Sequence, residues 1–396
     1  MISVTEALEK VLALAPAAHP RTVGLDQALG RVLLEPAQSR MVQPPFNSAA
    51  MDGYALRDAD ARQGARLTVI GEAAAGHPWQ GQPRPGTAIR IFTGAPVPDG
   101  YDRVVMQENT LREGDDITLT DAGGNTHIRA RGSDFSTGSM LAAGRVLNAG
   151  DLALLAAMNV PQVSVARAPR VAVLATGDEL VPPGDTPSPG QIICSNDLAV
   201  AALARQAGAQ ADLLGIARDN RDSLHDKLTR AADYDLIVTI GGASVGDHDL
   251  VGQVATDMGL ERSFYKIAMR PGKPLMAGRL GRAVMLGLPG NPVSSVVCGL
   301  IFMQPLLRAM QGGTPMAVTR RARLAHDLPP EGPRQHYLRA QRQTGPDLEV
   351  ISPFTDQDSA RLGLLSQADS LLIRPANDPA RKAGDIVEYL EIPRGC

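Results

Sequence analysis

Two glycine-rich turns that directly follow apolar runs are the segments of this 396-residue chain with the clearest chemistry. One follows Leu236–Ile240 and the other follows Ala283–Leu288. Glycine lets the backbone approach an anion closely, and the free amides at a helix start favour phosphate. The residues concerned are Gly241, Gly242, Ser244 and Gly246 in the first turn, and Pro289, Gly290, Asn291 and Pro292 in the second. Either turn alone could be a ligand-free connection, but together they predict a phosphate-binding floor.

A basic segment lies between these two turns in the sequence. Lys266, Arg270 and Lys273 fall within nine residues of a turn-prone stretch. Arginine offers a planar fork of donors, whereas lysine offers a flexible point charge, and both neutralise phosphate. A solvated basic loop is the alternative. The segment is therefore a candidate binding site for a phosphate or pyrophosphate.

Acidic residues follow three of the expected strands. Glu179 ends the segment Thr176–Glu179, Asp219 follows the next strand, and Asp247 and Asp249 follow the first glycine-rich turn. Each acid alone could be a helix cap or a surface residue. Carboxylates beside a phosphate site favour a bridging cation, and Mg²⁺ is commonly bound by one or two carboxylates together with phosphate oxygens. The sequence thus predicts a Mg²⁺ site at the same sheet edge.

The segments that must position these residues alternate between strand and helix over residues 169–316. Strands are expected at 171–175, 212–216, 236–240 and 283–288, and helices at 196–207, 221–232 and 291–310. Such alternation is typical of a doubly wound, mainly parallel sheet with helices on both faces. Ligands bind such sheets at the carboxyl ends of the strands. Ser195 or Asn196 is expected to cap the first of these helices.

The remainder of the chain predicts three further units. Residues 1–43 and 139–168 form a helical, elongated segment, with helices at 1–15, 25–33 and 151–158, the last capped by Asp151. Residues 44–138 are rich in glycine and proline with short apolar runs, which indicates a β-rich domain. Residues 317–396 alternate apolar and polar positions and predict a small C-terminal β-domain.

Composition limits the possible partners and location. The net charge is −3, 20% of residues are charged and 3% are aromatic, which argues against nucleic acid as the main partner. The three cysteines lack metal-ligand spacing, as expected in a reducing cytosol. The N-terminus does not have the pattern of a signal peptide. The sequence contains no run of about 18 apolar residues, so we expect no membrane helix. We therefore expect a cytoplasmic enzyme.

A rival interpretation comes from Gly242–Gly246, which fits the G-x-S-x-G nucleophile elbow with Ser244 as nucleophile. A triad would need a downstream histidine, and His326 or His336 could serve. Both fall in the expected C-terminal β-domain, and the sequence has no HGGG-type oxyanion segment. A serine hydrolase would also leave the second turn and the basic segment unexplained, so it remains the alternative.

Seven motifs in a fixed order resemble the molybdopterin molybdenumtransferase family, which includes bacterial MoeA and the E-domain of gephyrin. The resemblance covers nearly the whole chain. The motifs are PPFNSAAMDGYA (Pro44–Ala55), TGAPVP (Thr93–Pro98), TGDEL (Thr176–Leu180), SND (Ser195–Asp197), GGASVGDHD (Gly241–Asp249), MRPGKP (Met269–Pro274) and LPGNPVS (Leu288–Ser294).

The resemblance implies the reaction and the assembly. Adenylylated molybdopterin would be hydrolysed to release AMP, and molybdate would be inserted at its dithiolene sulfurs with the help of Mg²⁺. The family is dimeric, with an active site shared between subunits, and an adenylyltransferase that supplies the substrate is a further expected partner. The gephyrin branch also implies an alternative function as a peptide-binding scaffold.

The resemblance also implies roles for individual residues. One subunit would contribute Asp52, Thr93 and Asp134, and the other would contribute the residues of the α/β domain. Catalytic roles fall on Asp52, Asp134, Glu179, Asp249, Lys266 and Arg270, and Mg²⁺ would be held by Asp219 and Asp249. Substrate contacts are expected from Thr93, Ser195, Gly241, Gly242, Ser244, Gly246, Lys273, Pro289, Gly290, Asn291 and Pro292.

One segment departs from the family pattern. The usual loop reads PPFDNSAMDGYA, whereas this chain has Asn47, Ser48 and Ala49 where the family has Asp, Asn and Ser. Asp52 is retained. The roles of those three side chains are therefore in question, while the loop itself is expected to be present.

Overall fold

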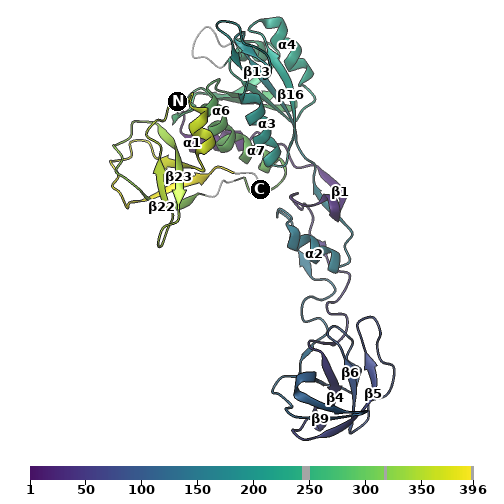
Figure 1. Ribbon diagram of the computed structural model, residues 1–396. Coiled ribbons are helices and arrows are strands. Elements are labelled where there is room, and N and C mark those ends of the chain that lie inside the picture. Colours follow the sequence, from purple (N-terminus) through teal and green to yellow (C-terminus); the bar gives the residue numbers. More distant parts are fainter. Residues whose placement is uncertain (243–249, 316–318, 394–396) are drawn as a thin grey trace.

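The computed structural model describes residues 1–242, 250–315 and 319–393. The molecule is elongated (Figure 1). An α/β domain and a C-terminal β-domain lie together at one end, and a β-rich domain lies at the other. A narrow segment that contains β1 and α2 joins the two ends.

The α/β domain is built on a six-stranded sheet in the order β16, β13, β17, β21, β20 and β18. The strand bounds are Gln210–Ala217 (β16), Arg170–Thr176 (β13), Leu236–Ile240 (β17), Ala283–Leu288 (β21), Met276–Leu280 (β20) and Leu260–Tyr265 (β18). The first four are parallel, which confirms the predicted mainly parallel sheet. The antiparallel strands β20 and β18, which flank the basic segment, were not predicted.

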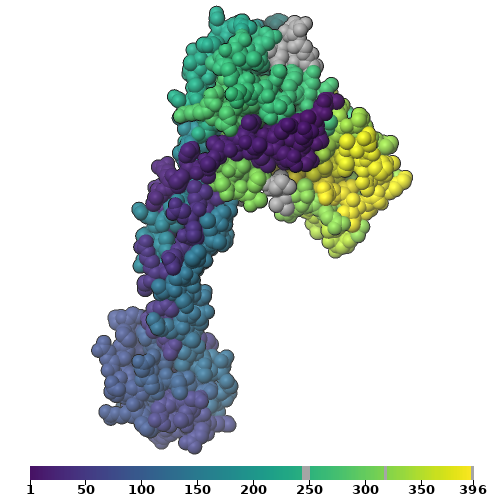
Figure 2. All heavy atoms as spheres, turned by 180° about the vertical axis from the view of Figure 1, so that it is seen from behind, coloured from purple at the N-terminus to yellow at the C-terminus, as the bar shows by residue number. Residues whose placement is uncertain are grey.

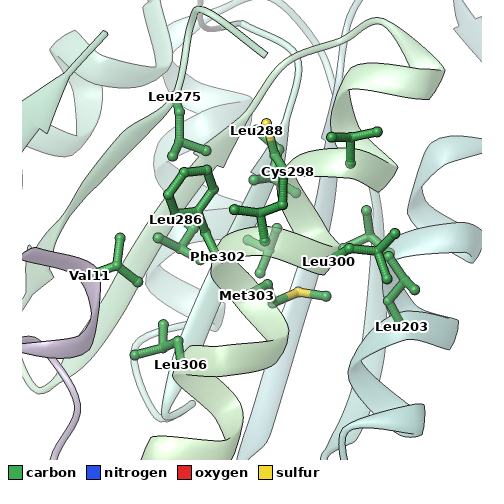
Figure 3. Close-up of a cluster of buried hydrophobic side chains, with 14 of the residues drawn as sticks. Val11, Leu203, Leu275, Leu286, Leu288, Cys298, Leu300, Phe302, Met303 and Leu306 are labelled. Carbon is green, nitrogen blue, oxygen red and sulfur yellow. The ribbon is translucent and has the colours of Figure 1, made fainter. Parts of the chain in front are cut away.

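Helices cover both faces of this sheet, as predicted. Their bounds are Val4–Leu12 (α1), Asn196–Gln206 (α3), Arg221–Arg230 (α4), Leu250–Asp257 (α5), Pro292–Cys298 (α6), Gly299–Met303 (η4, a π-helical turn) and Gln304–Met310 (α7). One apolar core contains side chains of α1, α3 and the α6–α7 helix, and a second contains those of α4 and α5. Figure 3 shows Val11 of α1 close to Phe302 and Leu286 in the first core. A short parallel pair, Leu180–Val181 (β14) and Ile192–Ile193 (β15), extends from this domain.

Within the described residues, one helix, Pro292–Met310, is long and apolar enough to cross a membrane by length and composition. Within its most apolar stretch, 89% is buried inside the protein. Its apolar character therefore follows from its position in the core of the α/β domain. Pro292 at the first helical position fits this start, because the amide that proline lacks would be unpaired there.

The elongated segment differs from the prediction in three respects. Helix α1 packs into the α/β core rather than on this segment, and the chain that follows it runs down from that domain (Figure 2). The predicted helix 25–33 is wrong: only Leu25–Gln27 (η1) is helical, because the amides of Gly30 and Leu33 bond to the carbonyls of residues 147 and 145. Asp151 is not the cap of α2, which begins at Ala149 after Asn148. The segment contains β1 (Pro20–Gly24), β2 (Ala37–Gln38), β11 (Met140–Leu141), α2 (Ala149–Ala157) and β12 (Gln162–Ala166).

Asn148 and Asp151 instead form a capping box. Asn148 Oδ1 accepts from the Asp151 amide, and Asp151 Oδ2 accepts from the Asn148 amide, both at 3.0 Å. This reciprocal arrangement satisfies two amides at the helix start. It places Asp151 in the first turn of the helix. The helix therefore begins at Ala149, two residues before the predicted start at 151.

The β-rich domain contains a six-stranded sheet in the order β7, β4, β6, β5, β9 and β8. Its elements are β3 (Ser48–Ala49), β4 (Gly53–Leu56), η2 (Asp58–Asp60), β5 (Arg66–Ala73), β6 (Thr87–Ile91), β7 (Arg103–Met106), η3 (Gln107–Asn109), β8 (Thr110–Glu113), β9 (Asp116–Leu119) and β10 (Ile128–Arg129). Apolar clusters lie on both faces of this sheet. The predicted β-rich character of this region is confirmed.

In the C-terminal domain, β23 pairs with both β24 and β25, so the sheet closes on itself as a small barrel. Its elements are β22 (Arg320–Leu324), β23 (Gln335–Gln343), β24 (Val350–Pro353), α8 (Leu362–Gln367), β25 (Ser370–Arg374) and β26 (Ile386–Glu391). Strand β19 (Met269–Arg270) of the basic segment joins β23 at the edge. The basic segment thereby connects the α/β domain to the barrel.

Candidate functional site

The two predicted turns meet at the carboxyl ends of β17 and β21. The Gly241 amide donates to the Leu288 carbonyl at 3.1 Å. A Cβ added to Gly290 would lie 3.5 Å from Gly241 Cα, so the two backbones are in contact. Gly241 has φ +92° and Gly242 has φ +66°, conformations that favour glycine. Ser244 and Gly246 lie outside the described residues, but the part of the first turn that is described lies beside the second.

Helix α3 begins beside the same turn. The Asn196 side chain donates a hydrogen bond to the Gly290 carbonyl at 2.7 Å, and Ser195 Oγ lies 3.4 Å from Asn196 Oδ1. Ser195 is the N-cap residue of α3, one of the two predicted, but its side chain makes no capping hydrogen bond. The side chain of Asn196 fixes the position of the second turn instead.

A loop of the C-terminal domain also reaches the start of α6. Ser359 accepts a 3.0 Å hydrogen bond from the Val293 amide through its carbonyl, and its Oγ accepts a 3.1 Å bond from Asn291 Nδ2. The Val293 amide at the start of α6 therefore already has a hydrogen-bond partner within the chain. Sequence analysis missed Ser359, because nothing local links it to a turn about 70 residues earlier.

Arg339 holds this loop from inside the barrel. Its side chain is 1% exposed, and its guanidinium donates to the carbonyls of Arg361, Asp358 and Asp356 at 2.9, 3.0 and 3.2 Å. Arg339 lies between Leu338 and Ala340, and this position between two apolar residues was the signal in the sequence that could have drawn attention to the loop. Arg339 fixes the backbone on both sides of Ser359.

We expect Arg339→Met to lower the free energy of unfolding by about 3 kcal/mol, because three partly buried hydrogen bonds to carbonyls would lose their charged donor. The substituted side chain keeps much of the volume but not the hydrogen bonds. Urea denaturation of the full chain measures the loss. Arg361→Gln is the matched control: Arg361 pairs with Asp356 of the same loop at 3.0 Å but is 64% exposed, so its loss should cost less than about 1 kcal/mol. Equal losses for the two variants would contradict the proposed role of Arg339.

The predicted carboxylates lie on neighbouring strand ends. Asp178 Oδ1 accepts from the Asp219 amide at 3.2 Å, and Asp219 Oδ2 accepts from the Asp178 amide at 3.4 Å. Arg218 Nη1 donates to the carbonyls of Asp178 and Leu180, both at 3.1 Å, and holds this turn in place. The side chain of Glu179 is exposed in the same turn. The sequence singled out Glu179 and Asp219 but gave no role to Asp178, which makes the direct contact.

The donor set at this edge suits a hard cation. Asp178 and Asp219 offer exposed carboxylate oxygens, the ligand type that Mg²⁺ prefers, and Mg²⁺ typically takes its remaining ligands from water and phosphate. Asp249, the other predicted ligand, lies outside the described residues, as does Asp247. Among the residues that are described, no group of three or more histidine, cysteine or acidic side chains could hold a metal ion by itself. The pair therefore fits Mg²⁺ when a substrate supplies further oxygens.

The three predicted cations lie on a closed loop that packs against α6. The Ile267 amide donates to the Lys273 carbonyl at 3.1 Å, and a Cβ on Gly272 would lie 2.6 Å from Cys298 Sγ. Lys266 Nζ lies 5.4 Å from the centroid of the Tyr265 ring. Arg270 is exposed and faces a cleft of the C-terminal barrel. The loop thus carries cations at the junction of the two domains.

The third group of predicted residues lies in the β-rich domain. Asp52 Oδ1 accepts from the Thr93 amide at 2.7 Å and from Thr93 Oγ1 at 2.8 Å. These bonds, the backbone one most of all, hold the pKa of the Asp52 carboxyl below its ordinary value, and Arg90 adds to the effect. Asp134 is exposed, and its amide donates to the Gln43 carbonyl at 3.0 Å, so it lies beside the same loop. Thr93 thus holds the Asp52 carboxylate in place and favours its ionised form; we call these two residues the Asp52–Thr93 unit.

The residues that depart from the family pattern have structural roles in this loop. Asn47 Oδ1 accepts from the Arg131 amide at 2.9 Å, while Ser48 and Ala49 are buried in β3. A carboxylate could accept the same hydrogen bond as the Asn47 amide oxygen. The loop therefore keeps its place beside residues 131–134 without the usual acid.

Asn47→Asp should accordingly change the free energy of unfolding by less than about 0.5 kcal/mol, because the acceptor is retained at an exposed position. Asn47→Ala should lose roughly 1 kcal/mol, the cost of one hydrogen bond. Thermal unfolding of the two variants and the wild type measures the difference. A larger loss for Asn47→Asp than for Asn47→Ala would show that the amide nitrogen matters instead.

A single chain does not bring all the predicted residues together. Strand β4 begins directly after Asp52, and β6 ends two residues before Thr93. Figure 1 shows these two strands at the opposite end of the molecule from β13 and β16. The α/β side unites Gly241, Gly242, Gly290, Asn291, Glu179 and Asp219. Asp52, Thr93 and Asp134 lie apart from it.

The chain matches three protein families along its length. Residues 2–159 match the MoeA N-terminal region (domain I and II), and residues 172–309 match a family described as a probable molybdopterin binding domain. Residues 321–392 match the MoeA C-terminal region (domain IV).

Individual proteins are similar over most of their length. A molybdopterin molybdenumtransferase of Nostoc sp. is 37% identical over 388 residues, which cover 94% of this chain and 88% of the relative. One of Haemophilus influenzae is 37% identical over 317 residues, or 79% and 78% of the two chains. A crystal structure of the molybdopterin biosynthesis MoeA protein from Pyrococcus horikoshii OT3 has a TM-score of 0.86 at 26% identity, covering 99% of this chain and 100% of that one.

Proposed function

The chain belongs to the molybdopterin molybdenumtransferase family, and from this premise we propose that it inserts molybdate into adenylylated molybdopterin with release of AMP. Membership makes it an enzyme, a transferase of molybdenum cofactor biosynthesis. The observation that carries the finer proposal is the contact between the turns at Gly241 and Gly290. It creates a floor of backbone at the carboxyl ends of two parallel strands, beside a pair of carboxylates.

Each part of the α/β side has a role in this proposal. The backbone at Gly242 and Gly290 receives the phosphate groups, and the α6 start adds its dipole. Gly241, whose amide bonds to the Leu288 carbonyl, shapes the turn instead. Lys266, Arg270 and Lys273 neutralise negative charge from the adjacent loop, with Arg270 as the planar fork. Glu179 is exposed in the same turn as Asp178 and is the proposed catalytic residue beside the scissile phosphate. Asn196, Ser359 and Arg339 hold the floor in position without needing to contact the substrate.

Asp219 would hold Mg²⁺, with Asp249 as its predicted second ligand and Asp178 as a neighbour whose oxygens face the same edge. Mg²⁺ bound there would polarise the scissile phosphate. Arg218 fixes the backbone of this turn and therefore the direction of both described carboxylates.

We further propose that the active site is shared between two subunits of a homodimer. The Asp52–Thr93 unit lies far from the α/β floor of its own chain (Figure 1), so a second copy must supply it if both act on one substrate. Large apolar side chains are exposed at both places. Phe46 and Met51 beside Asp52 are 40% and 41% exposed, and Ile192 and Leu198 beside Glu179 and α3 are 57% and 47% exposed. Such patches favour burial against another chain.

The proposed substrate comes from an adenylyltransferase, which is the expected further partner. The expected location is the cytoplasm. Neither nucleic acid nor a membrane is proposed as a partner.

Incubation of the purified chain with adenylylated molybdopterin, molybdate and Mg²⁺ tests the function. AMP release together with active cofactor is the expected result, and absence of both would reject it. Covalent labelling by a fluorophosphonate tests the serine hydrolase alternative in parallel, because only an activated Ser244 would react. Labelling without AMP release would favour that alternative.

A further inference from the structure

The C-terminal barrel carries a cleft that the proposed roles above do not use, apart from Arg270 at its rim. The cleft has a volume of about 960 Å³ and lies between the ends of β19, β23 and β25 and the loops 326–331 and 353–358. Small-molecule sites commonly measure roughly 300–1,000 Å³. Its lining includes Arg270, His336, Leu338, Phe354, Thr355 and Arg374. The cleft is therefore of a size to hold a whole ligand.

Most carboxylates around the cleft already have partners. Glu331 lies 2.9 Å from His336 Nδ1, Asp327 pairs with Lys382 at 2.7 Å, and Asp356 pairs with Arg361 at 3.0 Å. Asp358 accepts from the Ala360 amide at 2.8 Å and is the one lining acid without a cation within the described ranges. Asp327 and Asp356 are thus neutralised by cations, whereas Glu331, which bonds to an imidazole, and Asp358 keep their negative charge.

The floor of the cleft contains a buried cation. Arg374 is 1% exposed; its Nε pairs with Asp378, and its Nη2 donates to the carbonyls of Pro329 and Pro379 at 3.0 and 2.9 Å. Its Nη1 has no hydrogen-bond partner in the part of the chain that the structure describes. Asp378 also pairs with Arg381 at 2.6 Å, so these three side chains together carry one net positive charge.

Two further nitrogen groups lie above this floor. Arg270 is the register partner of His336, is exposed, and makes no ion pair or hydrogen bond through its side chain within the described residues. His336 is 5% exposed, and its Nε2 likewise has no hydrogen-bond partner among them. Burial is the main cause that lowers the pKa of His336; Glu331 opposes it, and Arg270 and Arg374 lower it further. Both guanidinium groups therefore act on the same point in the cleft.

The remaining lining suits an aromatic body. Leu338 is buried and Phe354 is half-buried, and three prolines, at 329, 330 and 353, complete the apolar part of the wall. Arginine binds phosphate with a planar fork, and an aromatic ring offers a face on which another ring can stack. We propose that this cleft binds a phosphate monoester of a planar ring compound, with the phosphate between Arg270 and His336 and above the charge of Arg374; His336 donates to Glu331 through Nδ1 and takes up a proton at Nε2 when the phosphate binds.

Two sources of such a group are possible, a nucleoside monophosphate or free phosphate. We take AMP as the occupant, a choice that rests on the proposed function, in which AMP is released. Calorimetric titration of the full chain with AMP, adenosine and inorganic phosphate separates the sources. AMP should bind at least about tenfold more tightly than adenosine, since one charged contact contributes about 1.4 kcal/mol or more. Phosphate should bind more weakly than AMP and compete with it. Adenosine binding as tightly as AMP would overturn the proposal.

Variants at the cleft complete the test. His336→Gln should weaken AMP binding at least about tenfold, and so should Thr355→Trp, which fills the cleft from an exposed position, whereas Thr355→Ser should not. Arg374→Lys should also weaken it. The matched control is Arg381→Lys, because Arg381 contacts the same Asp378 but does not line the cleft. If Arg374→Lys fails to fold, His336→Gln and the Thr355 pair decide.

The titration needs no turnover, so the two proposals can fail separately. Turnover in a chain whose AMP affinity is unchanged by His336→Gln and Thr355→Trp would overturn the cleft and leave the reaction intact. AMP binding that depends on these residues, in a chain without turnover, would remove the reaction and leave the cleft as a phosphate-ester site.

Discussion

Mixing two inactive variants, Asp52→Asn and Glu179→Gln, should restore about a quarter of the wild-type rate if the chain forms a symmetric dimer with shared sites. Random pairing makes half of the dimers mixed. Each mixed dimer contains one site with both substitutions and one site with neither. Half of the dimers with half of their sites intact gives the expected fraction.

Each variant alone should lose at least about 100-fold in rate, because each removes a charge placed beside the reacting groups. Neither should unfold. Asp52 and Glu179 are both exposed, and the asparagine oxygen can still accept from the Thr93 amide and hydroxyl. The rate is measured as AMP release after the two chains are co-expressed in equal amounts and all of the dimers are purified together.

The control for complementation uses two residues from the same side. Asp52→Asn and Thr93→Ala both alter the unit in the β-rich domain, so every site of their mixed dimer carries one substitution. That pair should restore no activity. Equal recovery in both mixtures, or no recovery in the first, would contradict a site assembled from the β-rich domain of one subunit and the α/β domain of the other.

The segments that the sequence predicted best are those whose environment is uniform along the chain. Strands β17 and β21 have the predicted bounds, because each is a continuous apolar run that is buried on both faces and ends at glycine or proline. The same logic found the helix from Pro292 to Met310. Antiparallel strands β18 and β20 were missed, because Leu260–Tyr265 contains three exposed polar residues that hide the strand pattern.

What the sequence could not predict depends on partners far along the chain. The spacing of apolar residues at 25–33 is helical, yet the amides there bond to residues 145 and 147. Ser195 is the N-cap residue of α3, as predicted, but the bond from Asn196 to Gly290 spans 94 residues. Ser359 reaches Asn291 across 68 residues. The two strands and the glycines that directly follow them lie where the sequence placed them, whereas the side chains that hold the second turn in place emerge only when the chain is folded.

Gly241→Ala should lower the free energy of unfolding by about 3 kcal/mol and abolish most of the activity, which makes it the sharpest test of the phosphate-binding floor. The glycine has φ +92°, which costs any other residue roughly 1–2 kcal/mol. The added methyl carbon would also lie 2.7 Å from the Thr176 carbonyl oxygen. That oxygen belongs to the end of β13, which is paired in register with β17, so neither strand can move away easily.

The cost of the backbone conformation can be separated from the cost of the contact. Gly184 has φ +100° but no atom within 4 Å of an added Cβ, and it lies in an exposed loop. Gly184→Ala should therefore lose only about 1 kcal/mol and keep its activity. Urea denaturation followed by circular dichroism compares the two variants, and AMP release measures their rates.

A phosphate-binding floor at Gly241 predicts that Gly241→Ala loses more stability and more activity than Gly184→Ala. If Gly241→Ala lost no more stability than Gly184→Ala, the close approach to Thr176 would not constrain the turn. If it lost stability but retained the wild-type rate at a temperature where it is folded, the turn would be a structural connection rather than a binding surface. The expected result is a loss of both, because the same glycine allows the strand to end against β13 and brings the first turn into contact with Gly290.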